Sequence, residues 1–89
     1  MRKGKLQIIN CILEETKNGG SNKTTIMRRV NMNWAQWKDY SSLMMRARLM
    51  KKEDGNNGDG RKYVIDEKGR EFQERYKEIK GLLSDKGYQ

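Results

Sequence analysis

Residues 21–48, SNKTTIMRRVNMNWAQWKDYSSLMMRAR, contain two amphipathic helical patterns with a three-residue break between them. In the first pattern, Ile26, Met27 and Val30 recur at helical spacing and predict a buried stripe. Ser21 stands where the N-cap of this helix is expected. The pattern ends near Val30, so the helix that it predicts is only about two turns long.

The break, Asn31-Met32-Asn33, predicts a tight turn between two helices. We expect Met32 to point into the core and Asn33 to cap the helix that follows. That helix is predicted over residues 34–48, with a core-facing stripe formed by Trp37, Tyr40, Met44 and Ala47. Two helices joined by so short a turn are typical of a helix-turn-helix.

The opposite side of the helix predicted over residues 34–48 carries small and basic side chains: Ala35, Lys38, Ser42 and Arg46. Such a strip suits a helix that must enter the major groove of DNA closely. A helix side that only faces solvent also favours polar residues. Both explanations fit the strip, and we favour DNA recognition.

The flanking segments predict the rest of a small α+β fold, mostly α with one β-hairpin. The expected elements are a helix from about Lys5 to Lys17, strands at Leu49–Glu53 and Arg61–Ile65, and a last helix of about three turns from Asp66. Three helices, a two-stranded wing and a C-terminal helix form a winged helix-turn-helix. We expect residues 1–65 to be this domain and residues 66–89 to be a dimerisation helix.

Positive charge is concentrated in the first half of the chain. The whole sequence carries 20 Lys and Arg against 12 Asp and Glu, a net charge of +8. Residues 1–52 hold 12 basic and 3 acidic residues, a net +9, whereas residues 53–89 hold 8 basic and 9 acidic residues, a net −1. A polyanion is the natural partner of such a surface, although solubility alone also accounts for a positive balance.

The chain lacks the residues from which most catalytic sites are built. It has no histidine and one cysteine, Cys11, so it offers neither a histidine base nor a Cys/His zinc site. We therefore expect no enzyme activity, no cofactor and no metal. Cys11 lies among apolar residues and is expected to be a small buried thiol. No apolar run suits a membrane span, which predicts a cytoplasmic, nucleoid-associated protein without a membrane partner.

Residues 8–13 and 23–40 contain several short motifs that also occur together in a known group of proteins. These are a hydrophobic first helix followed by Ser21, Lys23-Thr24, Ile26-Met27, Asn31, Ala35-Gln36 and Tyr40, with Lys68-Gly69 in the last helix. In these features the chain resembles small archaeal winged-helix DNA-binding proteins, both the dimeric ten-a type of chromatin protein and transcriptional regulators. The sequence departs from the family at Trp37, where a smaller residue is usual, at Ser41, where an apolar one is usual, and at Ala47-Arg48, which replaces a glycine-containing turn.

The resemblance implies that the helix over residues 34–48 enters the major groove of double-stranded DNA. Its candidate contacts are Trp34, Gln36, Lys38, Asp39 and Ser42. Gln36 can pair with adenine and Lys38 can reach guanine or a phosphate, whereas Asp39 repels phosphates unless it accepts from cytosine. Trp34 can instead pack against the first helix or a neighbouring subunit.

Basic residues on two other elements are predicted to contact the DNA backbone. They are Lys23, Arg28 and Arg29 on the second helix, and Arg61 and Lys62 on the wing. The alternative for the second helix is ordinary surface charge. Acidic residues around the wing weaken its field, so we expect the wing to contribute less than the helices.

The last predicted helix has an apolar stripe formed by Phe72, Tyr76, Ile79 and Leu83. In the family resembled, this helix forms an antiparallel coiled coil with its twin, which implies a homodimer. The alternative is that the stripe closes the core of its own domain.

Two other functions remain open from the sequence. The first is a protein-interaction adaptor that uses Trp34, Trp37, Met44 and Met45 as an apolar contact surface. The second is binding of structured RNA, which charge does not distinguish from DNA binding. Sequence specificity, an activating, repressing or architectural role, and any effector stay undetermined at this stage.

Overall fold

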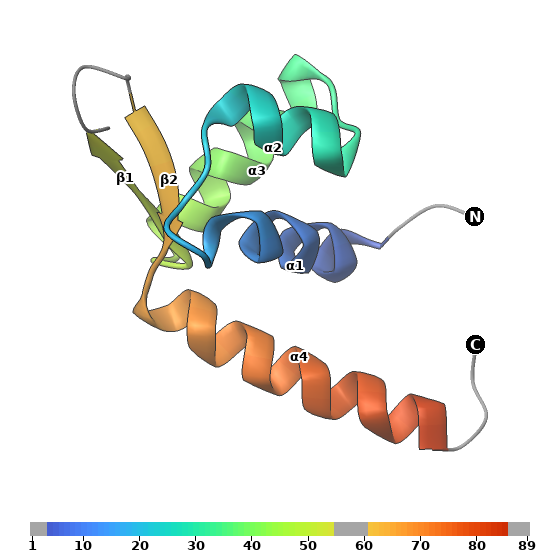
Figure 1. Ribbon diagram of the computed structural model, residues 1–89. Helices are drawn as coiled ribbons and strands as arrows, with labels where there is room; N and C mark the ends of the chain where they lie inside the picture. The colour runs from blue at the N-terminus through green and yellow to red at the C-terminus, as the bar shows by residue number, and fades with distance from the viewer. Residues whose placement is uncertain (1–3, 55–60, 86–89) are drawn as a thin grey trace.

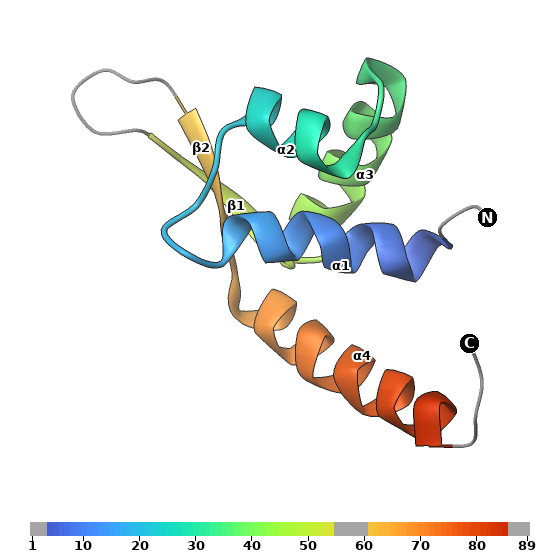
Figure 2. The same cartoon turned by 45° about the vertical axis from the view of Figure 1, so that its right-hand side comes forward.

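The computed structural model describes residues 4–54 and 61–85, with side chains up to residue 82. Its elements in chain order are α1 (Lys5–Thr16), α2 (Lys23–Val30), α3 (Trp34–Arg46), β1 (Met50–Asp54), β2 (Arg61–Ile65) and α4 (Glu67–Asp85). Helix α1 lies between α4 on one side and the α2–α3 pair on the other (Figures 1 and 2). The hairpin stands at one end of α1, and α4 starts from its base.

The link between α1 and α2 pairs with the hairpin. Ser21 and Tyr63 exchange two backbone hydrogen bonds of 2.9 and 2.7 Å, so the link borders β2. Gly20 has φ +90°, and a Cβ there would lie 2.6 Å from Val64 Cγ1. Only glycine fits this close approach of two backbones.

The predicted N-cap of α2 was wrong by one residue. Asn22 caps the helix, because its side-chain oxygen accepts a hydrogen bond of 2.8 Å from the backbone N–H of Thr25. Ser21 is held in its backbone pairing with Tyr63 instead. Both residue types are good caps, and the long-range pairing determines which one is used.

The turn between α2 and α3 is confirmed. Asn31 adopts the left-handed conformation with φ +61° that ends α2, and Met32 is half-buried against the core. Asn33 caps α3 through a reciprocal pair of hydrogen bonds: it accepts from the Gln36 N–H at 2.8 Å and donates its own N–H to Gln36 Oε1 at 2.9 Å.

Helix α3 ends at Arg46, two residues earlier than predicted, and Arg48 takes a left-handed φ of +62°. Trp37 and Met44 are buried and Tyr40 is half-buried, as expected of the core-facing stripe. Ala47 was wrongly assigned to that stripe, because it is the C-cap and is exposed. Ser41 is buried in the stripe, and its hydroxyl lies 3.4 Å from the carbonyl oxygen of Lys38.

Strands β1 and β2 form an antiparallel hairpin in which Lys52 faces Tyr63 and Glu53 faces Lys62. Strand β2 matches the prediction, and β1 begins one residue later than predicted, at Met50. The predicted loop tip falls on residues 55–60, outside the described residues. The hairpin joins α1, α2 and α3 around one core, formed by Ile9, Ile12, Leu13, Ile26, Val30, Trp37, Met44, Met50, Tyr63 and Ile65. Cys11 was expected to be buried and is half-buried at the edge of this core.

Helix α4 is longer than the sequence suggested. It has 19 residues, about five turns instead of three. Asp66 caps it by accepting a hydrogen bond of 2.7 Å from the Glu67 N–H. Within the described residues, no helix is long and apolar enough to cross a membrane.

Candidate nucleic-acid interface

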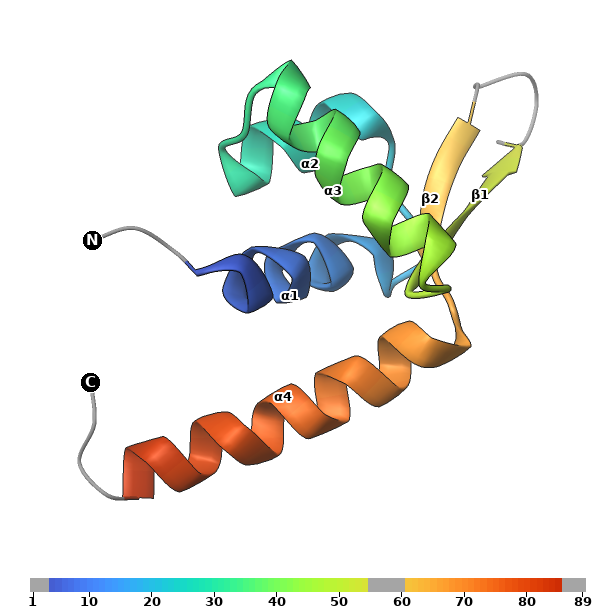
Figure 3. The same cartoon turned by 180° about the vertical axis from the view of Figure 1, so that it is seen from behind.

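The outer side of α3 is open to solvent along its whole length. Ala35, Lys38, Ser42 and Arg46 are all exposed. Helix α3 lies on the near side of the protein in Figure 3, in front of α2. Lys38 and Arg46 take part in no ion pair among the described residues, so their charges face solvent. This side can therefore meet a polyanion without giving up internal contacts.

Trp34 stands at the start of this surface and is 54% exposed. The Lys23 ammonium lies 4.3 Å from the centre of its ring, so α2 and α3 touch here through a cation–π contact. The sequence offered packing against α1 or a neighbouring subunit as the alternative for Trp34, and the ring instead meets α2. This contact holds the positive charge of Lys23 beside the first turn of α3.

The side chain of Gln36 is occupied within the protein. Its Oε1 accepts the Asn33 N–H in the reciprocal cap of α3. Reading adenine with both amide groups requires Oε1 to accept a second hydrogen bond beside the one from Asn33, so the cap restricts the directions in which Gln36 can meet a base.

Arg28 and Arg29 are exposed at the end of α2. Arg29 Nε lies 3.6 Å from a carboxylate oxygen of Glu15 on α1, which offsets part of its charge. Arg28 forms no ion pair with the described residues and is the freer of the two.

The two predicted wing residues lie on opposite faces of the hairpin. Tyr63 packs edge-on against Trp37 with ring centres 5.0 Å apart, so this face of β2 is turned toward α3. Because side chains alternate along a strand, Arg61 shares that face and Lys62 points away from α3. Arg61 Nε lies 3.8 Å from Asp54 Oδ1, which weakens its field. Lys62 instead borders a hollow with Lys17 and Arg70.

Two basic residues that the sequence did not single out belong near the α3 surface. Lys52 lies opposite Tyr63 in the sheet, with its ammonium 5.6 Å from the ring centre. Lys5 lines a hollow of about 440 Å³ together with Asp39, Ser42 and Arg46, so the Asp39 carboxylate shares this hollow with two basic side chains. Alternation along β1 from the apolar Met50 was a usable signal for Lys52. No local signal brings Lys5 on α1 beside α3.

Helices α2 and α3 form a helix-turn-helix, and a two-stranded hairpin follows it. Comparison of the sequence with known protein families finds the same arrangement. The model of the winged helix-turn-helix family matches residues 2–84. The chain belongs to this family. In a winged helix-turn-helix, the helix in the place of α3 is called the recognition helix and the hairpin is called the wing.

The fold also matches that of a solved structure. Sso10a-2, described as a DNA-binding protein from Sulfolobus solfataricus, superposes with a TM-score of 0.68 and 21% sequence identity. The match covers 94% of this chain and 90% of that one. No curated protein matches the sequence.

The apolar stripe on α4 divides into two parts. Phe72 and Tyr76 are half-buried and stacked, with ring centres 5.9 Å apart, and Phe72 packs against the core. Ile79 is 53% exposed and Leu82, which the sequence did not single out, is 62% exposed. The side chain of Leu83 lies outside the described residues. The part with Phe72 and Tyr76 thus closes the core of its own domain, which was the alternative to dimerisation. The part with Ile79 and Leu82 faces solvent.

Proposed function

We propose that this winged helix protein binds double-stranded DNA without catalysing a reaction, with α3 in the major groove and the wing beside the backbone. The observation that carries the proposal is the open outer side of α3, where Lys38 and Arg46 are exposed and form no ion pair with a described residue. Asp39 is exposed on the same helix and is its one acidic residue. The DNA-binding function of Sso10a-2, a protein of the same fold, supports it.

The charges around α3 support contact with phosphates. The basic side chains on or beside this surface are Lys5, Lys23, Arg28, Lys38, Arg46, Lys52 and Arg61. If six to eight basic groups meet phosphates, the logarithm of the affinity falls with the logarithm of salt concentration at a slope of about −5 to −7. Salt dependence of this steepness is the first expected property of the complex.

Charge reversal tests where the DNA lies. We expect Arg28→Glu with Lys38→Glu to weaken binding at least about tenfold at low salt and to flatten the salt slope by about 2, because two phosphate contacts are lost. The matched control is Lys68→Glu with Arg70→Glu, two exposed residues in the first turn of α4. Titration of a labelled random duplex by fluorescence anisotropy at two salt concentrations measures both.

Equal weakening by the two pairs would contradict a defined site on α3. Unchanged binding by the α3 pair would instead favour the adaptor function, which does not depend on these charges. Competition with duplex RNA in the same assay distinguishes the RNA alternative.

We further propose that residues 66–89 pair two subunits through the outer part of α4. Ile79 and Leu82 are large apolar side chains exposed on one helix, and an antiparallel copy of the helix would bury them. Such a homodimer carries two recognition helices, so one duplex can be contacted twice.

The cap of α3 favours weak sequence discrimination. Gln36 is the side chain best suited to read a base, and its side-chain oxygen already accepts a hydrogen bond within the helix cap, which limits how it can turn toward a base. We therefore favour an architectural role over a site-specific regulator. Selection of bound duplexes from a random pool tests this, and a sharp consensus sequence would contradict it.

A further inference from the structure

The start of α4 is locked onto the segment that leaves the recognition helix. The Leu49 carbonyl, just after α3, accepts a hydrogen bond of 2.9 Å from the Asp66 N–H, just before α4. A Cβ at Gly69 would overlap the same carbonyl oxygen, so the first turn of α4 sits directly on this backbone. One end of α4 is therefore fixed relative to α3.

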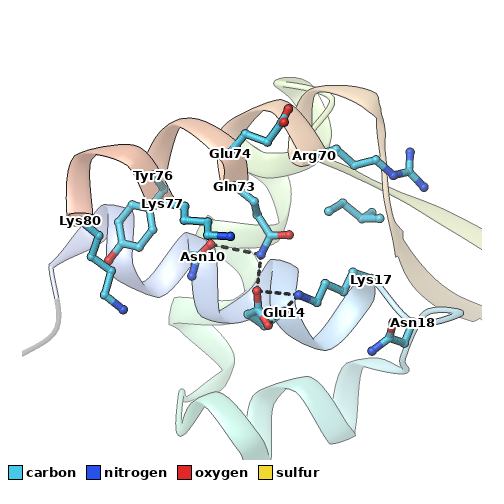
Figure 4. A pocket seen from close by; sticks show the side chains of 11 residues that line it. Asn10, Glu14, Lys17, Asn18, Arg70, Gln73, Glu74, Tyr76, Lys77 and Lys80 are labelled. Atoms are coloured by element: carbon cyan, nitrogen blue, oxygen red, sulfur yellow. Dashed lines mark hydrogen bonds and ion pairs between the residues drawn. The ribbon is translucent and has the colours of Figure 1, made fainter. Parts of the chain in front are cut away.

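The direction in which α4 leaves this joint depends on its contacts with α1. A groove of about 490 Å³ separates the two helices, and Gln73 reaches across it (Figure 4). Its side-chain N–H groups donate to Asn10 Oδ1 at 3.1 Å and to Glu14 Oε2 at 2.7 Å. Lys17 Nζ lies 3.1 Å from the same Glu14 carboxylate and holds it in place.

Helix α4 acts as a lever between this bridge and the proposed dimer contact. Its 19 residues span about 28 Å, so a tilt of about 10° at the joint moves the far end by about 5 Å. A major groove is about 12 Å wide, so a displacement of this size in each subunit changes whether both recognition helices fit one duplex.

We propose that Gln73 is a positioning residue that sets the separation of the two recognition helices in the dimer. The inference rests on the proposed dimer and adds to it the residue that fixes its geometry. Gln73 does this by tying α4 to α1, and it does not touch DNA itself.

A set of matched variants isolates the bridge. Gln73→Glu keeps the shape of the side chain but places a carboxylate against Glu14, so the bridge opens by repulsion. Adding Glu14→Gln restores a donor and an acceptor in reversed order, which should close it again. Gln7→Glu is the same chemical change on the exposed first turn of α1 and is the control.

Distances between the two α3 helices are measured by pulsed electron paramagnetic resonance. A spin label at Ala47→Cys, in full-length protein with Cys11→Ser, reports the exposed end of α3 in each subunit. Sedimentation velocity records the oligomeric state of every variant, and anisotropy records its DNA binding.

We expect one narrow distance distribution in the parent and in Gln7→Glu. Gln73→Glu should shift or broaden it by about 5 Å or more while the protein stays dimeric, and the reversed pair should restore it. An unchanged distribution in a dimeric, DNA-binding Gln73→Glu protein would overturn the role of Gln73 and leave the proposed function intact. A monomeric parent would overturn the inference together with the dimer.

Discussion

At the scale of single residues, Arg48 holds a backbone conformation that suits glycine. Its φ is +62°, in the left-handed region that glycine adopts without a steric penalty. A left-handed conformation destabilises the folded state by about 1–2 kcal/mol when the residue is not glycine. A glycine also has more conformational freedom in the unfolded state, which lowers the free energy of unfolding by about 0.4–1 kcal/mol and offsets part of the gain. We expect Arg48→Gly to raise the free energy of unfolding by up to about 1 kcal/mol in urea denaturation. Arg48→Ala is the control, and an equal gain from alanine would contradict the strain.

Also at this scale, Asn33 and Gln36 form the two hydrogen bonds that cap the start of α3. We expect Asn33→Ala to lower the free energy of unfolding by about 1 kcal/mol, because the exposed cap is lost. Gln36→Ala should cost less, since it removes only the returning bond of the cap, and should leave the affinity for random duplex DNA unchanged. Thermal unfolding and anisotropy measure the two effects. A loss of affinity confined to adenine-containing duplexes would show that Gln36 reads bases.

At the scale of elements, the two parts of α4 should respond differently to mutation. Ile79→Glu with Leu82→Glu places charges on exposed positions, so we expect dimers to dissociate while the domain stays folded. Phe72→Ala removes a ring packed against the core and should lower the free energy of unfolding by about 2 kcal/mol or more. Sedimentation velocity and thermal unfolding separate the outcomes. Unfolding caused by the Ile79 and Leu82 changes would show that the whole stripe closes the core.

The order of helices and strands was predictable because each element is indicated by residues close together in the sequence. Helical spacing predicted all four helices, and the paired asparagines around Met32 predicted the turn. Boundaries that depend on distant partners were not predictable. Ser21 lost the cap to Asn22 because it pairs with Tyr63, and the end of α3 depends on how Leu49 meets α4.

At the scale of the whole molecule, the candidate interface was only partly predictable. Helical periodicity placed Lys38 and Ser42 on the open side of α3, because one helix fixes their relation. The charge of the wing predicts that Lys62 and Arg61 act together, but the two side chains face opposite ways because side chains alternate along a strand. Lys5 was missed because only tertiary packing brings the start of α1 beside α3.

Nuclear magnetic resonance can show residue by residue whether DNA contacts the outer side of α3. A short random duplex is added to the isotopically labelled protein at low salt, and backbone amide shifts are followed residue by residue. We expect the largest shifts at Ala35, Lys38, Ser42 and Arg46, and their disappearance at high salt. Shifts confined to α4 and to the Lys62 face of the hairpin, with α3 unmoved, would contradict the account.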